Sequence, residues 1–252
     1  MKISIITAVY NNVRTISSCM ESVLSQTHPD LEYIIVDGGS QDGTADVIRN
    51  YQKNIAKFVS EPDNGIYDAL NKGIRMASGD VVGFLHADDL YADNTVIETV
   101  AAYMALHGVD SCYGDLIYVQ KDNTGRTIRY WKSCPYKEGL FQRGWMPPHP
   151  TYFVRRKVYE AHGVFDTSFR IAADYELMLR FLEKNRISTV YIPEVLVKMR
   201  MGGASNRSFR NMMVKTAEDY RAWKVNSLRR RFYTIPFKNL SKVRQFFFAR
   251  TL

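Results

Sequence analysis

Two adjacent carboxylates, Asp88 and Asp89, follow directly on the apolar run at residues 81–85. Carboxylate oxygens are the hard ligands that Mg²⁺ and Mn²⁺ take in proteins, and these ions commonly bridge a protein acid to a substrate phosphate. Aspartate is equally common at the start of a helix, and a helix is expected from residue 93 onward. The pair therefore predicts either a divalent metal site or a helix cap.

Asp37 ends a second apolar run, residues 32–36, and precedes the glycine-rich residues 38–44. An acid at this place can accept hydrogen bonds from a nucleoside, as it does in dinucleotide-binding folds. A Rossmann-type oxidoreductase would also need the pattern G-x-G-x-x-G after the first strand, and residues 7–12 contain no glycine. The P-loop pattern GxxxxGK[ST] is absent as well. Hydride transfer and P-loop phosphoryl transfer are therefore not the favoured reactions.

Two further groups of polar residues fall on helical stretches. Asp68 and Asn71 are three residues apart and share one helix face, which fits either a binding face or a merely solvated one. Asp174 lies in the first turn of the helix expected at residues 171–183, where the peptide dipoles stabilise a carboxylate. By itself it would be interpreted as a plain helix-start aspartate. Glu176, two residues on, faces elsewhere and is the weaker candidate for a base.

Short apolar runs alternate with amphipathic stretches over the first 107 residues. Hydrophobic strands that alternate with helices predict a parallel sheet covered on both faces, and ligands of such sheets bind beyond the carboxyl ends of the strands. Residues 7–11, Asp37 and residues 86–89 all follow strands, so we expect them to meet at one edge. The expected strands are residues 3–8, 32–36, 57–60 and 81–85, and the expected helices are residues 16–24, 44–51, 66–74 and 93–107.

The pattern changes after residue 110. Residues 111–119 and 126–132 alternate like the two strands of a hairpin. A loop rich in proline, glycine and aromatic residues follows at 144–150. The remaining expected elements are a strand at residues 151–154, a helix at 171–183, an edge strand at 189–193 and a long helix at 211–231 that ends before Pro236.

The chain resembles the inverting family 2 glycosyltransferases in five segments that occur in order: SIITAVYN, IIVDGGSQDGT, EPDNGIYDALNKG, ASGDVVGFLHADD and IAADYELMLR. The likeness is greatest to the bacterial branch that builds capsule, O-antigen and exopolysaccharide. It implies an α/β domain of the GT-A fold over residues 1–205, with a Rossmann-like, mostly parallel sheet flanked by helices, and a basic, aromatic-rich helical extension over residues 206–252. It also implies transfer of a sugar from a nucleotide diphosphate, usually UDP, to an acceptor hydroxyl with inversion at the anomeric carbon.

Position by position, the resemblance implies a metal site, a base and a donor pocket. Asp88 matches the metal-binding carboxylate of the family's D-x-D motif, here His86-Ala87-Asp88, and Asp89 is a weaker ligand; the expected ion is Mn²⁺ or Mg²⁺. His86 replaces the first aspartate of the motif and is assigned to the pocket. Asp174 matches the family's catalytic aspartate. The other residues implied for the nucleotide-sugar pocket are Thr7, Ala8, Tyr10, Asn11, Asp37, Asp63, Asp68, Asn71 and Ala87.

Two segments are expected to flank this site. In the loop at residues 144–150, Trp145 would stack on an acceptor sugar and His149 would reach the metal or the diphosphate; a proline-stiffened loop with a buried tryptophan fits the same residues. Residues 198–205 resemble the family's flexible lid, in which Arg200 or Ser205 would contact the diphosphate. The paired glycines of that segment otherwise indicate a turn.

The net charge of +8 is confined to the end of the 252-residue chain. Residues 221–252 contain nine Lys or Arg and no acid, so residues 1–220 hold 25 basic and 26 acidic residues. This distribution argues against a nucleic-acid surface across the body of the protein. A cationic, aromatic, acid-free segment suits the surface of an anionic membrane. Packing on the domain, or contact between copies in a homo-oligomer, fits the same composition.

Three cysteines without CxxC spacing, and no apolar run near the ~18 residues of a spanning helix, favour a cytoplasmic protein. The N-terminus is too short and too polar for a signal peptide. We expect a metal-dependent hexosyl- or N-acetylhexosaminyl-transferase that uses a glycan or lipid-linked glycan acceptor for surface polysaccharide synthesis, peripheral to the inner membrane. A catalytically inactive nucleotide-sugar-binding scaffold is the alternative, because His86 departs from the motif.

Overall fold

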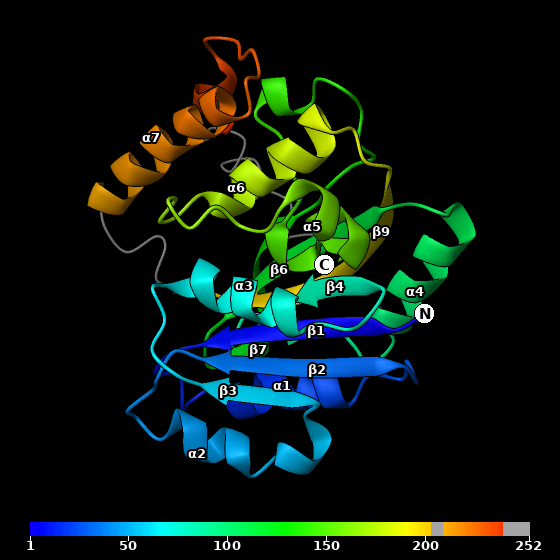
Figure 1. Cartoon of the computed structure of the whole chain (residues 1–252), viewed down its shortest axis with the longest axis vertical. Helices are drawn as coiled ribbons and strands as arrows, with labels where there is room; N and C mark the ends of the chain where they lie inside the picture. The colour runs from blue at the N-terminus through cyan, green and yellow to red at the C-terminus, as the bar shows by residue number, and fades with distance from the viewer. Residues whose placement is uncertain (203–208, 239–252) are drawn as a thin grey trace.

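The computed structural model describes residues 1–202 and 209–238 (Figure 1). Its strands are β1 (Ile3–Val9), β2 (Leu31–Asp37), β3 (Lys57–Ser60), β4 (Val81–Phe84), β5 (Leu90–Tyr91), β6 (Ser111–Gln120), β7 (Asn123–Trp131), β8 (Phe153–Arg155) and β9 (Thr189–Arg200). Within the described residues these form one nine-stranded sheet in the order β3-β2-β1-β4-β8-β6-β9-β5, and β7 pairs with β6 beside this path. β1 to β4 are parallel, whereas β8 runs antiparallel to both of its neighbours.

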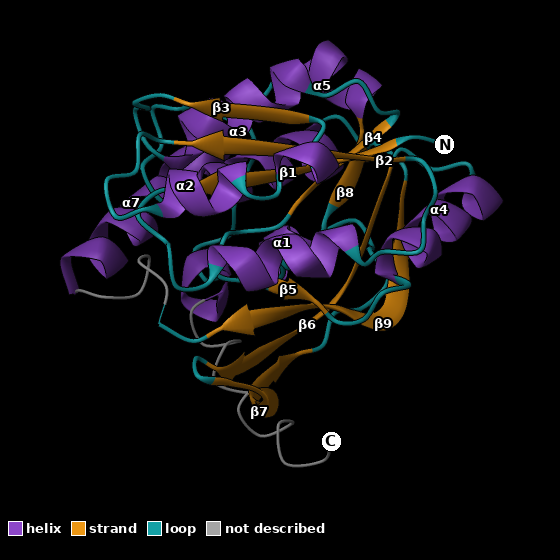
Figure 2. Ribbon diagram, turned by 90° about the horizontal axis from the view of Figure 1, so that it is seen from below, coloured by secondary structure: helices purple, strands orange, loops and turns teal. Residues whose placement is uncertain are grey.

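Helices cover both faces of the sheet: α1 and α4 lie on one face (Figure 2), and α3 and α6 pack on the other. The α-helices are α1 (Ile16–Leu24), α2 (Thr44–Arg49), α3 (Ile66–Met76), α4 (Val96–His107), α5 (Arg156–His162), α6 (Ala173–Met178) and α7 (Phe209–Val225). A π-helical turn, Leu179–Lys184, extends α6, and 3-10 turns lie at Gln52–Asn54, Phe141–Arg143 and His149–Thr151.

Alternation along β1 explains why the sheet has a hydrophobic core on each side. Ile3 and Ile5 pack with the apolar residues of α1 and α4, whereas Ile6 and Ala8 pack with those of α3 and α6. All seven residues of β1 are buried, as expected for a strand inside a sheet covered on both faces. The predicted α/β fold class, a largely parallel sheet flanked by helices with a helical C-terminal extension, is confirmed.

The predicted edge strand at residues 189–193 was wrong in length and place. β9 continues to Arg200 and lies between β6 and β5, so it is an interior strand. Pro193 suggested a strand end, but the strand passes it at a break in the β6–β9 register between Tyr113 and Asp115. A bulge lets a strand tolerate the missing N–H of proline. This correction matters for the site, because the end of β9 carries Arg200 to the sheet edge.

The described part of the C-terminal extension packs on the α/β domain. Trp223 and Ile235 are 1% exposed and belong to the same core as Phe84. The hydroxyl of Thr234 donates to the carbonyl oxygen of Gln142 at 2.8 Å. Residues 239–252, the last part of the cationic segment predicted to suit an anionic membrane, lie outside the described residues. In residues 1–202 and 209–238, none of the helices combines the length and the hydrophobicity needed to cross a bilayer.

Candidate active site

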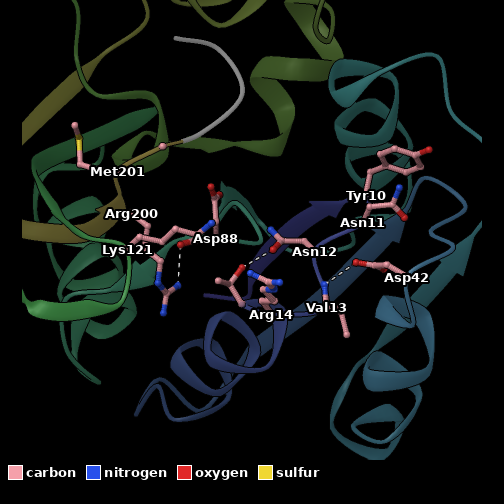
Figure 3. A pocket seen from close by; sticks show the side chains of 12 residues that line it. Tyr10, Asn11, Asn12, Val13, Arg14, Asp42, Asp88, Lys121, Arg200 and Met201 are labelled. Atoms are coloured by element: carbon pink, nitrogen blue, oxygen red, sulfur yellow. Dashed lines mark hydrogen bonds between the residues drawn. The ribbon is translucent and has the colours of Figure 1, made fainter. Parts of the chain in front are cut away.

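A cleft of about 340 Å³ opens at the carboxyl ends of β1 and β4, beside the start of α1 (Figure 3). Its walls come from the loop after β1, the loop after β2, the turn after β4, the β6–β7 turn and the end of β9. Four of the predicted donor or metal residues meet here, as the sheet-edge rule requires. The lining residues are Tyr10, Asn11, Asn12, Val13, Arg14, Thr15, Asp42, Asp88, Lys121, Arg200, Met201 and Gly202.

The cleft brings three cations, Arg14, Lys121 and Arg200, together with the acids Asp42 and Asp88. Such a mixture can hold an anionic diphosphate together with a divalent cation. Arg14 and Lys121 were not predicted. Arg14 lies in the loop that follows β1, so its place beyond the carboxyl end of that strand is the sequence signal for it. Lys121 reaches the cleft only because β6 pairs with β9, which no local pattern shows.

Asn11 ties the loop after β1 to the loop after β2. Its φ of +48° lies in the left-handed region, which asparagine tolerates better than most residues. Its backbone N–H donates to Ser40 Oγ at 2.8 Å, and its side-chain oxygen accepts from the backbone N–H of Gln41 at 2.9 Å. Asp37 lies beneath the same loop, fully buried, and accepts hydrogen bonds from Ser40 and from Ser60 Oγ. Asp37 therefore organises the second loop in this structure.

Three predicted pocket residues are used inside the protein. The Thr7 hydroxyl is buried and lies 3.1 Å from the Tyr33 hydroxyl. Ala8 is also buried. The amide of Asn71 is committed to the backbone of Phe165, donating to its carbonyl oxygen at 2.9 Å and accepting from its N–H at 3.0 Å. These side chains hold the walls in place, and their contact with a nucleotide stays a prediction.

Asp63 and Asp68 both shape the loop that leads into α3. Asp63 Oδ1 accepts the backbone N–H of Gly65 at 2.8 Å, and Asp68 Oδ2 accepts that of Asn64 at 3.1 Å. A side chain on Gly38 would overlap the Asp63 carboxylate, so this glycine allows Asp63 to approach the loop after β2. Asp63 therefore lies beside the Asp37 loop, on the side where a nucleoside is expected.

The turn after β4 is clamped by the end of β9. Arg200 Nη1 donates to the carbonyl oxygen of Asp88 at 2.8 Å, and the backbone N–H of Arg200 donates to Asp89 Oδ1 at 3.2 Å. The hydroxyl of Thr15 donates to the carbonyl oxygen of Ala87, which is buried in the same turn. Burial, reinforced by the charge of Asp88, raises the pKa of Asp89 well above its ordinary value.

The acids differ in their fitness as metal ligands. Asp88 lines the cleft, whereas Asp89 is fully buried and absent from its walls. Among the described residues no group of three or more His, Cys, Asp or Glu is arranged to hold a metal ion. Mg²⁺ and Mn²⁺ are commonly held by one or two carboxylates together with substrate phosphates and water. The chemistry at Asp88 fits such an ion in the presence of a diphosphate, and this placement favours Asp88 over Asp89.

His86, His149 and Asp174 form a polar group next to the turn after β4. The two imidazole centroids are 5.8 Å apart, and His149 stacks on Phe84 at 5.5 Å. Burial lowers the pKa of His149 to about 4 and also lowers the pKa of His86, although the negative charge of Asp174 opposes both shifts. Both rings are therefore neutral near pH 7 and can offer one donor and one acceptor each.

Asp174 lies in the first turn of α6, at the border between buried and exposed residues. Its Oδ1 accepts the backbone N–H of Tyr175 at 2.8 Å. The charges of Asp88 and Asp174 both oppose the lowering of the His86 pKa by burial, and only Asp88 of the two acids lines the cleft. Glu176, by contrast, is buried and paired with Arg180 at 2.8 Å, so it serves the fold.

The predictions for the two flanking residues Trp145 and Ser205 have different outcomes. Trp145 is half-buried and contacts three rings, with centroid distances of 5.7 Å to Tyr113, 5.8 Å to Tyr136 and 5.4 Å to Phe141. These contacts fit the buried-tryptophan alternative, and stacking on a sugar stays a prediction. Ser205 lies outside the described residues.

Comparisons with known proteins agree with this geometry. Residues 4–163 match the family "Glycosyl transferase family 2". A PGL/p-HBAD biosynthesis glycosyltransferase of Mycobacterium bovis is 30% identical over 208 residues, which cover 81% of this chain and 78% of the relative. An uncharacterised glycosyltransferase of Rickettsia typhi is 30% identical over 233 residues, covering 87% of this chain and 69% of the relative.

Solved structures share the fold at low sequence identity. S. aureus TarS, residues 1–349 in complex with UDP-GlcNAc, superposes with a TM-score of 0.72 at 17% identity, over 90% of this chain and 66% of that one. A mannosyltransferase of Pyrobaculum calidifontis in complex with GDP-Man and Mn²⁺ gives a TM-score of 0.64 at 18% identity, over 99% of this chain and 73% of that one. At such identities the likeness establishes the fold alone.

Proposed function

This chain belongs to glycosyltransferase family 2, and from that premise we propose that it transfers a sugar from a UDP-sugar to a hydroxyl group with inversion. The observation that carries the proposal is the place of Asp88 on the wall of a cleft that Arg14, Lys121 and Arg200 also line. A phosphate-binding edge and a separate carboxylate near it are what direct displacement needs.

In the proposed reaction, Asp174 accepts the proton of the acceptor hydroxyl. The hydroxyl oxygen attacks the anomeric carbon, a new C–O bond forms, and the bond from that carbon to the β-phosphate oxygen breaks. UDP leaves with the electron pair, and the configuration at the carbon inverts. Arg200, Lys121 and Arg14 stabilise the negative charge that develops on the diphosphate.

We propose that Asp88 holds Mn²⁺ or Mg²⁺ together with the donor phosphates. Such an ion would act as a Lewis acid that neutralises the leaving diphosphate. Support comes from the place of Asp88 on the cleft wall and from the mannosyltransferase neighbour, whose structure contains Mn²⁺ with GDP-Man. The half-buried His86 and the buried His149 are assigned to the pocket rather than to the metal.

The proposed acceptor is a glycan or lipid-linked glycan of surface polysaccharide synthesis, reached at the cytoplasmic face of the inner membrane. The acid-free stretch at residues 221–252 supports contact with an anionic bilayer. Its described part presents Phe232, which is 86% exposed, next to the exposed Arg229–Arg231 run.

Sedimentation with vesicles containing phosphatidylglycerol should fall for Phe232→Ser and remain for Leu106→Ser, an equally exposed apolar control at 80%. Equal sedimentation of the two variants would exclude this contact; association through this surface into a homo-oligomer would appear instead as a change in mass.

The activity is tested by UDP release across a panel of nucleotide sugars, with Mn²⁺ or Mg²⁺ and with a chelator. We expect release with one UDP-sugar, dependent on acceptor and abolished by chelation. Release that is unchanged by chelator would remove the metal from the proposal. Tight UDP-sugar binding without any turnover, across the acceptors tried, would favour the inactive scaffold.

A further inference from the structure

Glu218 of α7 binds the backbone immediately ahead of Asp174. Its carboxylate accepts the N–H groups of three consecutive residues, Arg170 at 2.7 Å and Ile171 and Ala172 at 2.8 Å each. Glu218 is buried, with 8% of its surface exposed. Because Ala172 is the residue that precedes α6, these bonds fix the approach of the chain to the first turn of the helix.

α7 and the residue just beyond its end also hold the residues that follow Asp174. Trp223 Nε1 donates to the Tyr175 hydroxyl at 2.9 Å, and Asn226 Nδ2 donates to Glu176 Oε1 at 3.1 Å. Trp223 and Asn226 are both buried. Glu218 and Trp223 of α7, with Asn226 just beyond it, thus contact the chain on each side of Asp174.

The opposite side of this segment is held from α3. The hydroxyl of Tyr67 donates to the carbonyl oxygen of Ile171 at 2.7 Å. The peptide on which Asp174 depends is therefore bonded through its N–H to α7 and through its C=O to the donor side of the domain. The first N–H groups of α6 have no acceptor within the helix, as at any helix start, so the chain that leads into it depends on partners from other elements.

We propose that Glu218 is a positioning residue for the base Asp174. Glu218 itself is buried, and the segment it binds is non-helical and passes from the exposed Arg170 to the buried Ala172. An ionised carboxylate is the side chain that can accept from three neighbouring N–H groups at once. Glutamine at this position offers one oxygen and turns an NH₂ group toward donors. The loop then relaxes, Asp174 moves relative to the acceptor hydroxyl, and proton transfer slows while the donor cleft is untouched.

The inference rests on the proposed role of Asp174, and its test separates the two. For Glu218→Gln we expect kcat to fall by roughly 10- to 100-fold, as misplacement by about 1 Å does, with the donor KM and the affinity for UDP within about twofold of wild type. The matched control is Glu32→Gln, which removes another buried carboxylate that accepts a backbone N–H, at the opposite end of the sheet. Its kcat should match wild type although its stability falls.

A double variant distinguishes positioning from general weakening. If Glu218 acts through Asp174, then Glu218→Gln adds less than about twofold to the loss caused by Asp174→Asn. The inference is overturned if the fold-decrease in kcat of the double variant equals the product of the two single decreases. It is also overturned if folded Glu218→Gln keeps the wild-type kcat. Either result leaves Asp174 as the base. If Glu218→Gln does not fold, Tyr67→Phe tests the same peptide from the other side and should lower kcat at unchanged affinity for UDP. Wild-type kcat in a folded Tyr67→Phe would overturn the inference in that case.

Discussion

Replacement of Lys238 by methionine is expected to lower the free energy of unfolding by about 3–5 kcal/mol, because it strands the carboxylate of Asp219 in the interior. Lys238 Nζ lies 2.5 Å from Asp219 Oδ1, and the two side chains are 2% and 1% exposed. The same ammonium group lies 3.3 Å from the centroid of the Tyr175 ring. The variant therefore removes an ion pair and a cation–π contact at the point where the C-terminal extension meets α6.

The sign follows from which charge is left behind. Burial lowers the pKa of Lys238 to about 8 although the charge of Asp219 raises it, so desolvation of the ammonium group outweighs its attraction to Asp219. Removing one partner leaves desolvation without compensation, whereas removing both does not. We therefore expect the double variant with Asp219→Asn to recover all but about 1–2 kcal/mol of the loss.

Urea unfolding followed by circular dichroism measures these differences directly. For a domain of this size the expected loss corresponds to a Tm lower by roughly 6–20 °C. The slope of the unfolding free energy against urea should stay unchanged, since the same surface is exposed. A loss below about 1 kcal/mol for the single variant, or no recovery in the double variant, would refute the view that residues 209–238 are part of the domain's core.

Three further results are expected. The pKa of Glu32 is lowered to about 2, because hydrogen bonds from Ser4 and Ser78 and the charge of Lys57 outweigh the effect of burial. The ionised carboxylate therefore stabilises the fold above pH 4.5, and this contribution is lost as the pH falls through 2. Glu32→Gln should therefore cost roughly 3 kcal/mol at pH 7 and progressively less in acid, whereas Glu194→Gln, an exposed control, should cost nothing at either pH, as urea titrations will show. Gly144→Ala should destabilise the fold by about 2 kcal/mol or more in thermal unfolding, because φ is +78° and the added methyl group would overlap the backbone at Lys238; an unchanged Tm would contradict that close packing. Arg200→Ala should raise the donor Kd in titration calorimetry by roughly tenfold through loss of a charged contact, and an unchanged Kd would remove Arg200 from the diphosphate site.

The sequence was most informative where a function depends on the end of a strand. Asp37 and Asp88 could be placed at one sheet edge because parallel strands bring their carboxyl ends together, whatever their distance along the chain. Asp174 could be placed only through its resemblance to the family motif, since an aspartate in a first helical turn has an ordinary capping role.

Other features depend on pairings that local sequence does not contain. The course of β9 past Pro193 is set by its neighbours β6 and β5, and this pairing brings Arg200 and Lys121 to the cleft. Glu218 falls in a helix whose pattern predicts only packing, and its three backbone partners lie in a distant loop. Buried polar contacts between distant segments carry no periodicity, so they become visible only in the folded chain.

The most direct test of the proposed mechanism is the rate of UDP release by Asp174→Asn at saturating donor and acceptor. The substitution keeps the size of the side chain and removes its capacity to accept a proton. We predict a kcat lower by about 100-fold or more with an unchanged affinity for UDP, the loss typical of a missing general base. A kcat within about fivefold of wild type in a variant that still binds UDP would contradict the assignment of Asp174 as the base.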